Sequence, residues 1–232
     1  MHDYPGSSER GTPPGTMTIL PPTFPTARLA RAAVLTACAV LGALLLARPA
    51  HAGPLVASAP DCDDQALTRP FLPWVDVAYY TPHPGGAFEG ALDGWRLDDG
   101  AKVVKGNEPF AVASADDARS LSLPAGAEAT SSTICVGLGH PTLRLFARRT
   151  SGSIFSTLQV EVLFETAWGS VLRLPIGLVT GSDEWAPTLP MLVVANLLPL
   201  LPGDRTPVAF RFTALGGDWL VDDVFVDPWR AR

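Results

Sequence analysis

The chain has 232 residues, of which 17 are Lys or Arg and 23 are Asp or Glu, so its net charge at pH 7 is −6. Its lysines are Lys102 and Lys105 alone. A protein that follows a nucleic-acid backbone needs a stripe of basic side chains, so this composition argues against nucleic acid as a partner.

Residues 1–52 have the features of a cleavable export signal. A basic stretch at 27–31 precedes sixteen uncharged, mostly apolar residues at 32–47, and the tripeptide Ala50-His51-Ala52 follows. Signal peptidase recognises this order of basic, apolar and small-residue regions. We therefore predict cleavage after Ala52 and a secreted or extracytoplasmic protein.

Two other interpretations of the leader are weaker. A membrane anchor needs about 20 apolar residues, and the run at 32–47 is shorter. Leu35-Thr36-Ala37-Cys38 resembles a lipoprotein box, but the apolar run continues well past Cys38, where such a box should end it. We expect no membrane span after processing.

Three parts follow from this boundary. We expect residues 1–52 to comprise a disordered N-terminus and the signal peptide, residues 53–73 a Pro- and Ala-rich lead-in, and residues 74–229 a single β-sandwich domain. The 180 residues after position 52 carry 13 basic and 21 acidic side chains, a net charge of −8. This length is sufficient for one domain with a substantial core.

Two cysteines, Cys62 and Cys135, remain after processing. An even pair in an oxidising compartment is most simply a disulfide, which here would tie the lead-in to the domain. Two buried free thiols are the alternative.

The domain has the residue pattern of β-structure. Apolar and polar residues alternate through 158–165 and through 208–213, which indicates half-buried strands. Weaker or shorter strand candidates are 101–104, 120–123, 133–136, 142–147, 171–174 and 220–226. Gly-, Pro- and Asp-containing turn signals separate these segments, and short strands at this spacing indicate an all-β sandwich or barrel. The apolar run at 189–201 is interrupted by prolines, and we expect a strand plus loop or a short helical turn there.

Three motifs give a family resemblance: an opening Phe88-Glu89-Gly90 with Gly94-Trp95, a central Ser120-Leu121-Ser122-Leu123, and a closing Val221-Asp222-Asp223-Val224. Together they resemble antiparallel jelly-roll β-sandwiches of carbohydrate-binding modules and galactose-binding-like domains, over about residues 80–228. The resemblance implies that the first and last strands are adjacent.

The resemblance also implies a structural Ca²⁺ ion, held by Glu89 with Asp222 or Asp223. Ca²⁺ takes six to eight oxygen ligands, and neighbouring carboxylates repel unless a cation compensates them. The alternative is that Asp222 and Asp223 point to opposite faces of a strand, one solvated and the other hydrogen-bonded or paired with Arg.

Sugar recognition in such modules uses exposed aromatic rings together with polar side chains. Trp168 and Trp185 lie in predicted loops or strand ends and are the candidate ligand-binding platforms, whereas Trp95 and Trp219 are predicted to belong to the core. After position 52 the chain has only two Asn and two Gln residues. This scarcity of amide side chains weakens the case for carbohydrate binding.

Catalysis has little support in the sequence. His83 and His140 are the histidines of the domain, both in turn-like contexts, and no hydrolase, zinc-protease or phosphate-loop motif accompanies them. Glu161 and Glu165 would face the same side of a strand about 13 Å apart, too far for either glycosidase geometry. We interpret them as a solvated strand face.

We therefore expect an exported, non-catalytic β-sandwich module. Its function is either the binding of a glycan or a structural or protein-interaction role in the envelope without sugar affinity. An enzyme or a carrier of another ligand has less support.

Overall fold

The computed structural model describes residues 53–59, 65–166, 168–181, 183–197 and 205–227. The chain divides into two compact units, Met1–Pro49 and Ala50–Arg232, and every described residue belongs to the second. The predicted signal peptide and Cys62 lie outside the described residues.

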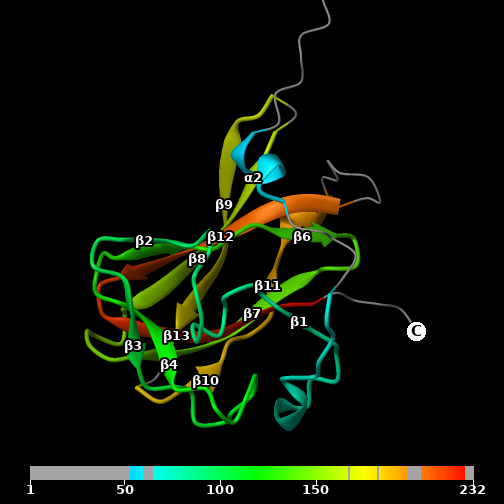
Figure 1. Cartoon of the computed structure of the whole chain (residues 1–232). Coiled ribbons are helices and arrows are strands. Elements are labelled where there is room, and N and C mark those ends of the chain that lie inside the picture. The colour runs from blue at the N-terminus through cyan, green and yellow to red at the C-terminus, as the bar shows by residue number, and fades with distance from the viewer. Residues whose placement is uncertain (1–52, 60–64, 167, 182, 198–204, 228–232) are drawn as a thin grey trace, which may run out of the picture. The chain divides into compact units, whose positions relative to one another are not determined.

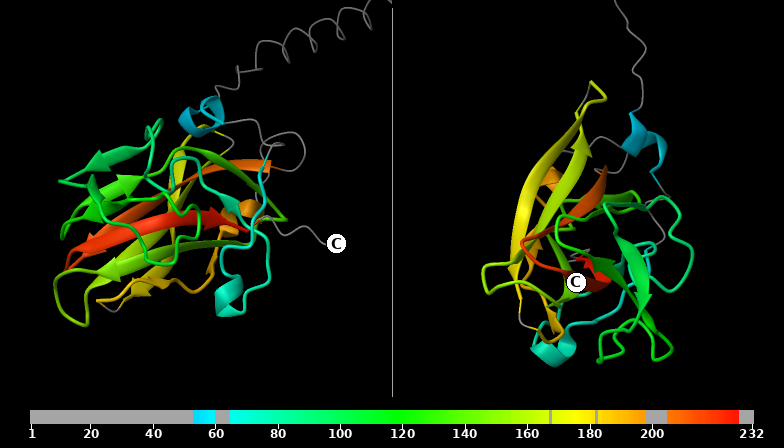
Figure 2. Two further views of the ribbon diagram at one scale, coloured as in Figure 1. Left: turned by 60° about the horizontal axis from the view of Figure 1, so that its bottom comes forward. Right: turned by 90° about the vertical axis from the view of Figure 1, so that its left-hand side faces the viewer.

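The second unit is a sandwich of two antiparallel sheets (Figures 1 and 2). The first, called the β7–β13 sheet, has the order β10-β7-β13-β4-β3, with β1 on β13 and β11 on β7. Its strands are β1 (Thr81–Pro82), β3 (Lys102–Lys105), β4 (Arg119–Leu123), β7 (Thr142–Arg149), β10 (Ala186–Pro187), β11 (Met191–Leu192) and β13 (Trp219–Val226).

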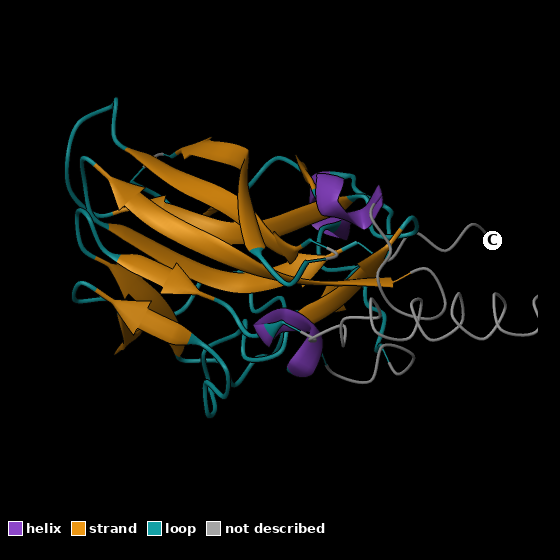
Figure 3. Ribbon diagram, turned by 90° about the horizontal axis from the view of Figure 1, so that it is seen from above, coloured by secondary structure: helices purple, strands orange, loops and turns teal. Residues whose placement is uncertain are grey.

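The second sheet, called the β8–β12 sheet, has the order β2-β5-β12-β8-β9, with β6 also on β12. Its strands are β2 (Arg96–Asp98), β5 (Glu128–Thr130), β6 (Ile134–Gly137), β8 (Thr157–Glu165), β9 (Val171–Thr180) and β12 (Arg205–Leu215). The described helical segments are short (Figure 3): α2 (Pro54–Ala57), η1 (Leu72–Trp74) and η2 (Val194–Leu197).

The core lies between the sheets and follows from the alternation of side chains along each strand. On β12, Val208, Phe210 and Phe212 are fully buried, and they meet the equally buried Val160 and Val162 of β8 across the register. Trp219 is fully buried and Trp95 packs against the same core, as predicted for both.

The segment 71–80 packs on the outer face of the β7–β13 sheet. Phe71 and Tyr80 are buried there against Phe146 and Phe225. The Arg144 guanidinium lies 4.0 Å from the centroid of the Phe71 ring and forms an ion pair with Asp76 at 2.6 Å. This face therefore carries a small aromatic core of its own.

The all-β prediction is confirmed, and each predicted strand has a counterpart in the structure. β1 pairs with β13, but the opening motif Phe88-Glu89-Gly90 lies in a loop and not on a strand next to β13. The described part of the run at 189–201 contains both β11 and η2, so the strand and the short helical turn, expected as alternatives, occur one after the other.

One prediction about side chains is wrong. Glu161 and Glu165 are not solvated: they are only 7% and 3% exposed. Arg211 pairs with Glu161, and the segment around Gly53 lies against Glu165. Both partners are remote in sequence, so the strand pattern could not reveal them.

Candidate functional site

The outer face of the β8–β12 sheet carries eight polar side chains in two rows. The register places Arg211 opposite both Glu161 and Thr130, while Thr213 lies opposite Gln159 and Glu128. Arg96 and Asp98 of β2 extend the two rows. We call this set the polar grid: Arg96, Asp98, Glu128, Thr130, Gln159, Glu161, Arg211 and Thr213.

Four strands contribute to the polar grid because each presents alternate residues to the face opposite the core. Neighbouring strands are about 4.8 Å apart, so the grid spans about 14 Å across β2, β5, β12 and β8. Six of its members are half-buried, Arg96 is exposed and Glu161 is buried.

Arg211 is the centre of the polar grid. Its Nε donates to Glu161 Oε2 at 2.7 Å and its Nη1 donates to Glu128 Oε2 at 3.1 Å. The Thr213 hydroxyl donates to the other Glu128 oxygen at 3.4 Å. Such charge-assisted bonds hold the side chains in fixed positions.

The polar grid also has unused hydrogen-bonding capacity. The Thr130 hydroxyl is buried and has no hydrogen-bond partner among the described residues. Buried polar groups are normally paired, so a ligand or water that reached Thr130 would satisfy it.

No aromatic ring lies in the polar grid. Trp168 is 89% exposed in the turn between β8 and β9, at one end of the same sheet. Trp185 packs against the aromatic cluster of the other sheet, where Arg148 lies over its ring at 5.6 Å. The two predicted platforms are therefore not on one surface.

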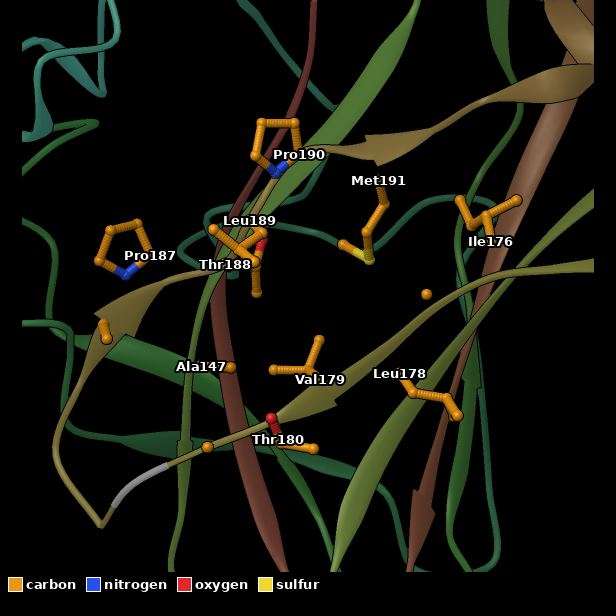
Figure 4. Close-up of a pocket in the computed structure, with 13 residues that line it drawn as sticks. Ala147, Ile176, Leu178, Val179, Thr180, Pro187, Thr188, Leu189, Pro190 and Met191 are labelled. Atoms are coloured by element: carbon orange, nitrogen blue, oxygen red, sulfur yellow. The ribbon is translucent and has the colours of Figure 1, made fainter.

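A pocket of about 480 Å³ lies at the edge of the sandwich, where the chain crosses from β9 to β10 (Figure 4). Val179 and Thr180 line one side, and Thr188 and Met191 line the other. The volume is in the range of ligand sites. Its thirteen lining residues include no charged side chain, which suits an apolar group rather than a sugar.

The acidic residues predicted to hold a cation lie beside β13. Asp222 Oδ2 accepts a hydrogen bond from the Glu108 backbone N–H at 3.2 Å, and Asp223 Oδ2 accepts one from Ala113 N–H at 3.3 Å. Glu89 accepts bonds from the backbone N–H groups of Ala118 and Arg119 at the start of β4.

Two further carboxylates, Glu108 and Asp117, complete this group. We call Glu89, Glu108, Asp117, Asp222 and Asp223 the acidic cluster. The negative charge of Glu89 raises the pKa of Asp117, after the larger effect of burial. Burial first, and then the charges of Glu108 and Asp117, raise the pKa of Asp223.

The acidic cluster lacks an internal counter-charge. Burial raises the pKa of Asp222 to about 9, with a further contribution from Asp223. The Asp223 Oδ1 and Asp117 Oδ2 atoms are buried and have no hydrogen-bond partner among the described residues. Asp223 also has a backbone φ of 48°, at a register shift in β13. Asp222 and Asp223 are both buried, so neither is solvated as the alternative interpretation proposed.

The described carboxylates have the oxygen chemistry that Ca²⁺ prefers. In that part of the chain, however, no three His, Cys, Asp or Glu side chains converge closely enough to hold a metal ion. Sequence analysis missed Glu108 and Asp117 because they belong to an irregular loop, 106–118, and neither is part of a motif.

The two histidines of the domain are buried. Burial lowers the pKa of His83 to about 4, and its Nδ1 pairs with the Pro84 carbonyl at 2.9 Å. His140 Nδ1 accepts a hydrogen bond from Gly137 N–H, and its Nε2 lies 2.9 Å from the Gln65 side-chain oxygen. These contacts hold loops together. The partners in them are a backbone carbonyl, a backbone N–H group and an amide side chain, and none of them is a nucleophile.

Cys135 is fully buried in β6. Because Cys62 lies outside the described residues, their disulfide stays a prediction. The described ranges contain no helix with the length and apolarity needed to cross a bilayer.

Comparison with known proteins finds no matching family model and no matching curated protein. Among solved structures, the chain is similar to the CBM22-1 xylan-binding domain from Paenibacillus barcinonensis Xyn10C, at 15% identity and a TM-score of 0.40, over 62% of this chain and 91% of that one.

A C-terminal family 22 carbohydrate-binding module of Clostridium thermocellum Xyn10B gives 15% identity and a TM-score of 0.39, over 62% of this chain and 92% of that chain. A family 11 carbohydrate-binding module from Clostridium thermocellum gives 14% and 0.35, over 63% and 95%. The chain thus has structural similarity to carbohydrate-binding β-sandwich modules, and nothing about its function follows from these values.

Proposed function

We propose that the protein is an exported, non-catalytic jelly-roll module that binds an uncharged glycan on the polar grid. The observation that supports this proposal is the arrangement of eight hydrogen-bonding side chains in two rows on one face of the β8–β12 sheet.

Sugar hydroxyl groups both donate and accept hydrogen bonds, and the polar grid offers both kinds of group. Arg211, Gln159 and the threonines can donate, while Glu161 and Glu128 can accept. The grid's positive and negative charges largely compensate each other, which suits a neutral ligand. Because Arg211 fixes both glutamates, little side-chain freedom is lost on binding.

Aromatic stacking on the sugar ring contributes less to binding here than the sequence predicts, because only one of the two predicted platforms, Trp168, lies on the sheet that carries the polar grid. The polar grid has no aromatic side chain. We therefore propose Trp168, at the end of the same sheet, as the residue that stacks on the sugar. Trp185 packs on the other sheet and has no role in this proposal.

A pull-down with insoluble polysaccharides tests the proposal. We expect the processed protein to be retained by at least one polysaccharide, and the double variant Gln159→Ala/Thr213→Ala to be retained much less. Lys102→Ala is the matched control, because Lys102 is exposed on β3 of the other sheet. Equal retention of all three proteins, or retention of none, would contradict glycan binding by the polar grid.

A protein-interaction role is the second candidate, and the edge pocket favours it. Leu178 and Leu189 line this pocket and are 64% and 83% exposed, so a partner could insert an apolar side chain there. In that case Leu178→Asp abolishes association with an envelope partner, and the polar-grid variants leave it unchanged.

We further propose a structural Ca²⁺ ion at the acidic cluster. The unpartnered Asp223 Oδ1 and Asp117 Oδ2 atoms support it, because a buried carboxylate oxygen requires a hydrogen-bond donor or a cation. The carboxylates would have to move closer together around the ion. Its effect on stability is predicted in the Discussion.

A further inference from the structure

Gly53 both follows the predicted cleavage site and contacts the folded domain. Cleavage after Ala52 makes Gly53 the first residue of the mature protein, a prediction made from the leader sequence alone. The structure independently places Gly53 directly against the side chain of Glu165 at the end of β8.

The contact is close. A Cβ atom added to Gly53 would lie 2.5 Å and 2.7 Å from the two carboxylate oxygens of Glu165. The backbone φ of Gly53 is −75°, which any residue can adopt. A larger residue here would displace the Glu165 carboxylate, while the backbone conformation itself would accept it.

Glu165 is a buried carboxylate without a cation. It is only 3% exposed, and it accepts a hydrogen bond from the backbone N–H of Leu55. No Lys, Arg or His side chain in the described ranges forms an ion pair with it. A buried charge is costly unless it is paired.

The amino nitrogen of Gly53 can reach this carboxylate. Nitrogen and Cβ are bonded to the same Cα and lie about 2.5 Å apart, given N–Cα and Cα–C bonds of about 1.5 Å. The Gly53 nitrogen is thus within about 5 Å of both oxygens, and a modest rotation brings it into contact.

We propose that export processing creates a cation that neutralises Glu165. Signal peptidase hydrolyses the Ala52–Gly53 amide with one water molecule, leaving a carboxyl group on Ala52 and an amine on Gly53. At neutral pH that amine takes up a proton, and the resulting ammonium pairs with the Glu165 carboxylate. The unprocessed chain has an uncharged amide at the same place.

The ion pair fixes the mature N-terminus over the β8–β12 sheet. Helix α2 contacts β8 and β12, and the Ser58 hydroxyl bonds to the Thr133 hydroxyl at 2.7 Å. Glu165 lies on the same face of β8 as Glu161 and Gln159. The inference depends on the proposed export but not on glycan binding.

The test begins with the exported, processed protein, whose first residue is read by N-terminal sequencing. A portion is then acetylated at mildly acidic pH, where the two lysines stay protonated, and mass spectrometry confirms a single acetyl group on Gly53. Melting temperatures of the free and acetylated forms are compared for the natural chain and for Glu165→Gln.

We expect acetylation to lower the melting temperature of the natural chain by about 4 °C and to leave that of Glu165→Gln unchanged. Should Glu165→Gln fail to fold, Glu165→Leu takes its place. An unchanged melting temperature in the natural chain, or an equal decrease in both backgrounds, overturns the ion pair. A mature N-terminus at another residue also overturns it, whereas a protein that is not processed at all refutes export.

Discussion

Two groups of carboxylates in this domain differ in whether a positively charged side chain lies beside them. Glu161 and Glu128 on the β8–β12 sheet share the guanidinium of Arg211, with a shortest distance of 2.5 Å. Asp222 and Asp223 on β13 have backbone N–H groups and other carboxylates around them. The two glutamates of the first group share one counter-charge, which leaves a net charge of −1, whereas the carboxylates of the second group repel one another.

This difference in counter-charge determines whether each group needs a bound proton or cation to be stable. A carboxylate paired with a guanidinium can remain buried and still offer its remaining lone pairs to a ligand. Carboxylates with unpartnered oxygens and raised pKa values are stabilised by protonation or by a bound cation. This difference underlies the two proposals, recognition at the polar grid and ion binding at the acidic cluster.

The largest expected effect comes from unbalancing the first group. Arg211→Met leaves Glu161 and Glu128 without their cation and should lower the free energy of unfolding by about 3 kcal/mol. Urea unfolding measures the loss. The double variant Arg211→Met/Glu161→Gln should recover a large part of it, and no recovery would show that the ion pair is not the cause.

Removing a charge from the acidic cluster should raise the free energy of unfolding, whereas removing Arg211 should lower it. Without divalent cations at pH 7, Asp223→Asn relieves repulsion and should raise the free energy of unfolding by about 1 kcal/mol. With Ca²⁺ the natural chain should gain thermal stability, whereas Asp223→Asn should gain little. EDTA must reverse the gain. Equal melting temperatures with Ca²⁺ and with EDTA would exclude the ion.

His83 offers a third comparison, because it is buried in the neutral form. Its pKa is about 4 in the folded protein and about 6.5 when unfolded, so the unfolded chain binds more protons between these values. Stability should therefore fall as pH decreases from 6.5 to 4, by up to about 3 kcal/mol from this group. Protonation of Asp222 works in the opposite direction, so the natural chain is compared with His83→Asn, which should lack this loss.

The smallest effect is expected at Trp168. With 89% of the residue exposed, Trp168→Ala should change the free energy of unfolding by less than about 0.5 kcal/mol. Its retention by a polysaccharide should nevertheless decrease if the ring stacks on a sugar. Unchanged retention would confine recognition to the polar grid.

The strands were predictable because alternation and turn residues are local signals. The polar grid was not, since it depends on the register that places Arg211 between Glu161 and Thr130. For the same reason Glu161 was expected to be solvated: its partner is 50 residues away. The closing motif points to Asp222 and Asp223 alone, because Glu108 and Asp117 belong to a loop without periodicity.

The central claim is that the polar grid binds a glycan, and an NMR titration tests it most directly. Backbone amide spectra of the ¹⁵N-labelled processed protein are recorded while an oligosaccharide from a retained polysaccharide is added. The account predicts that the largest shifts cluster on β5, β8 and β12 around Glu128, Gln159 and Arg211, with little change on β3, β4 and β13. Shifts confined to the β7–β13 sheet, or no shifts at saturating sugar, would contradict it.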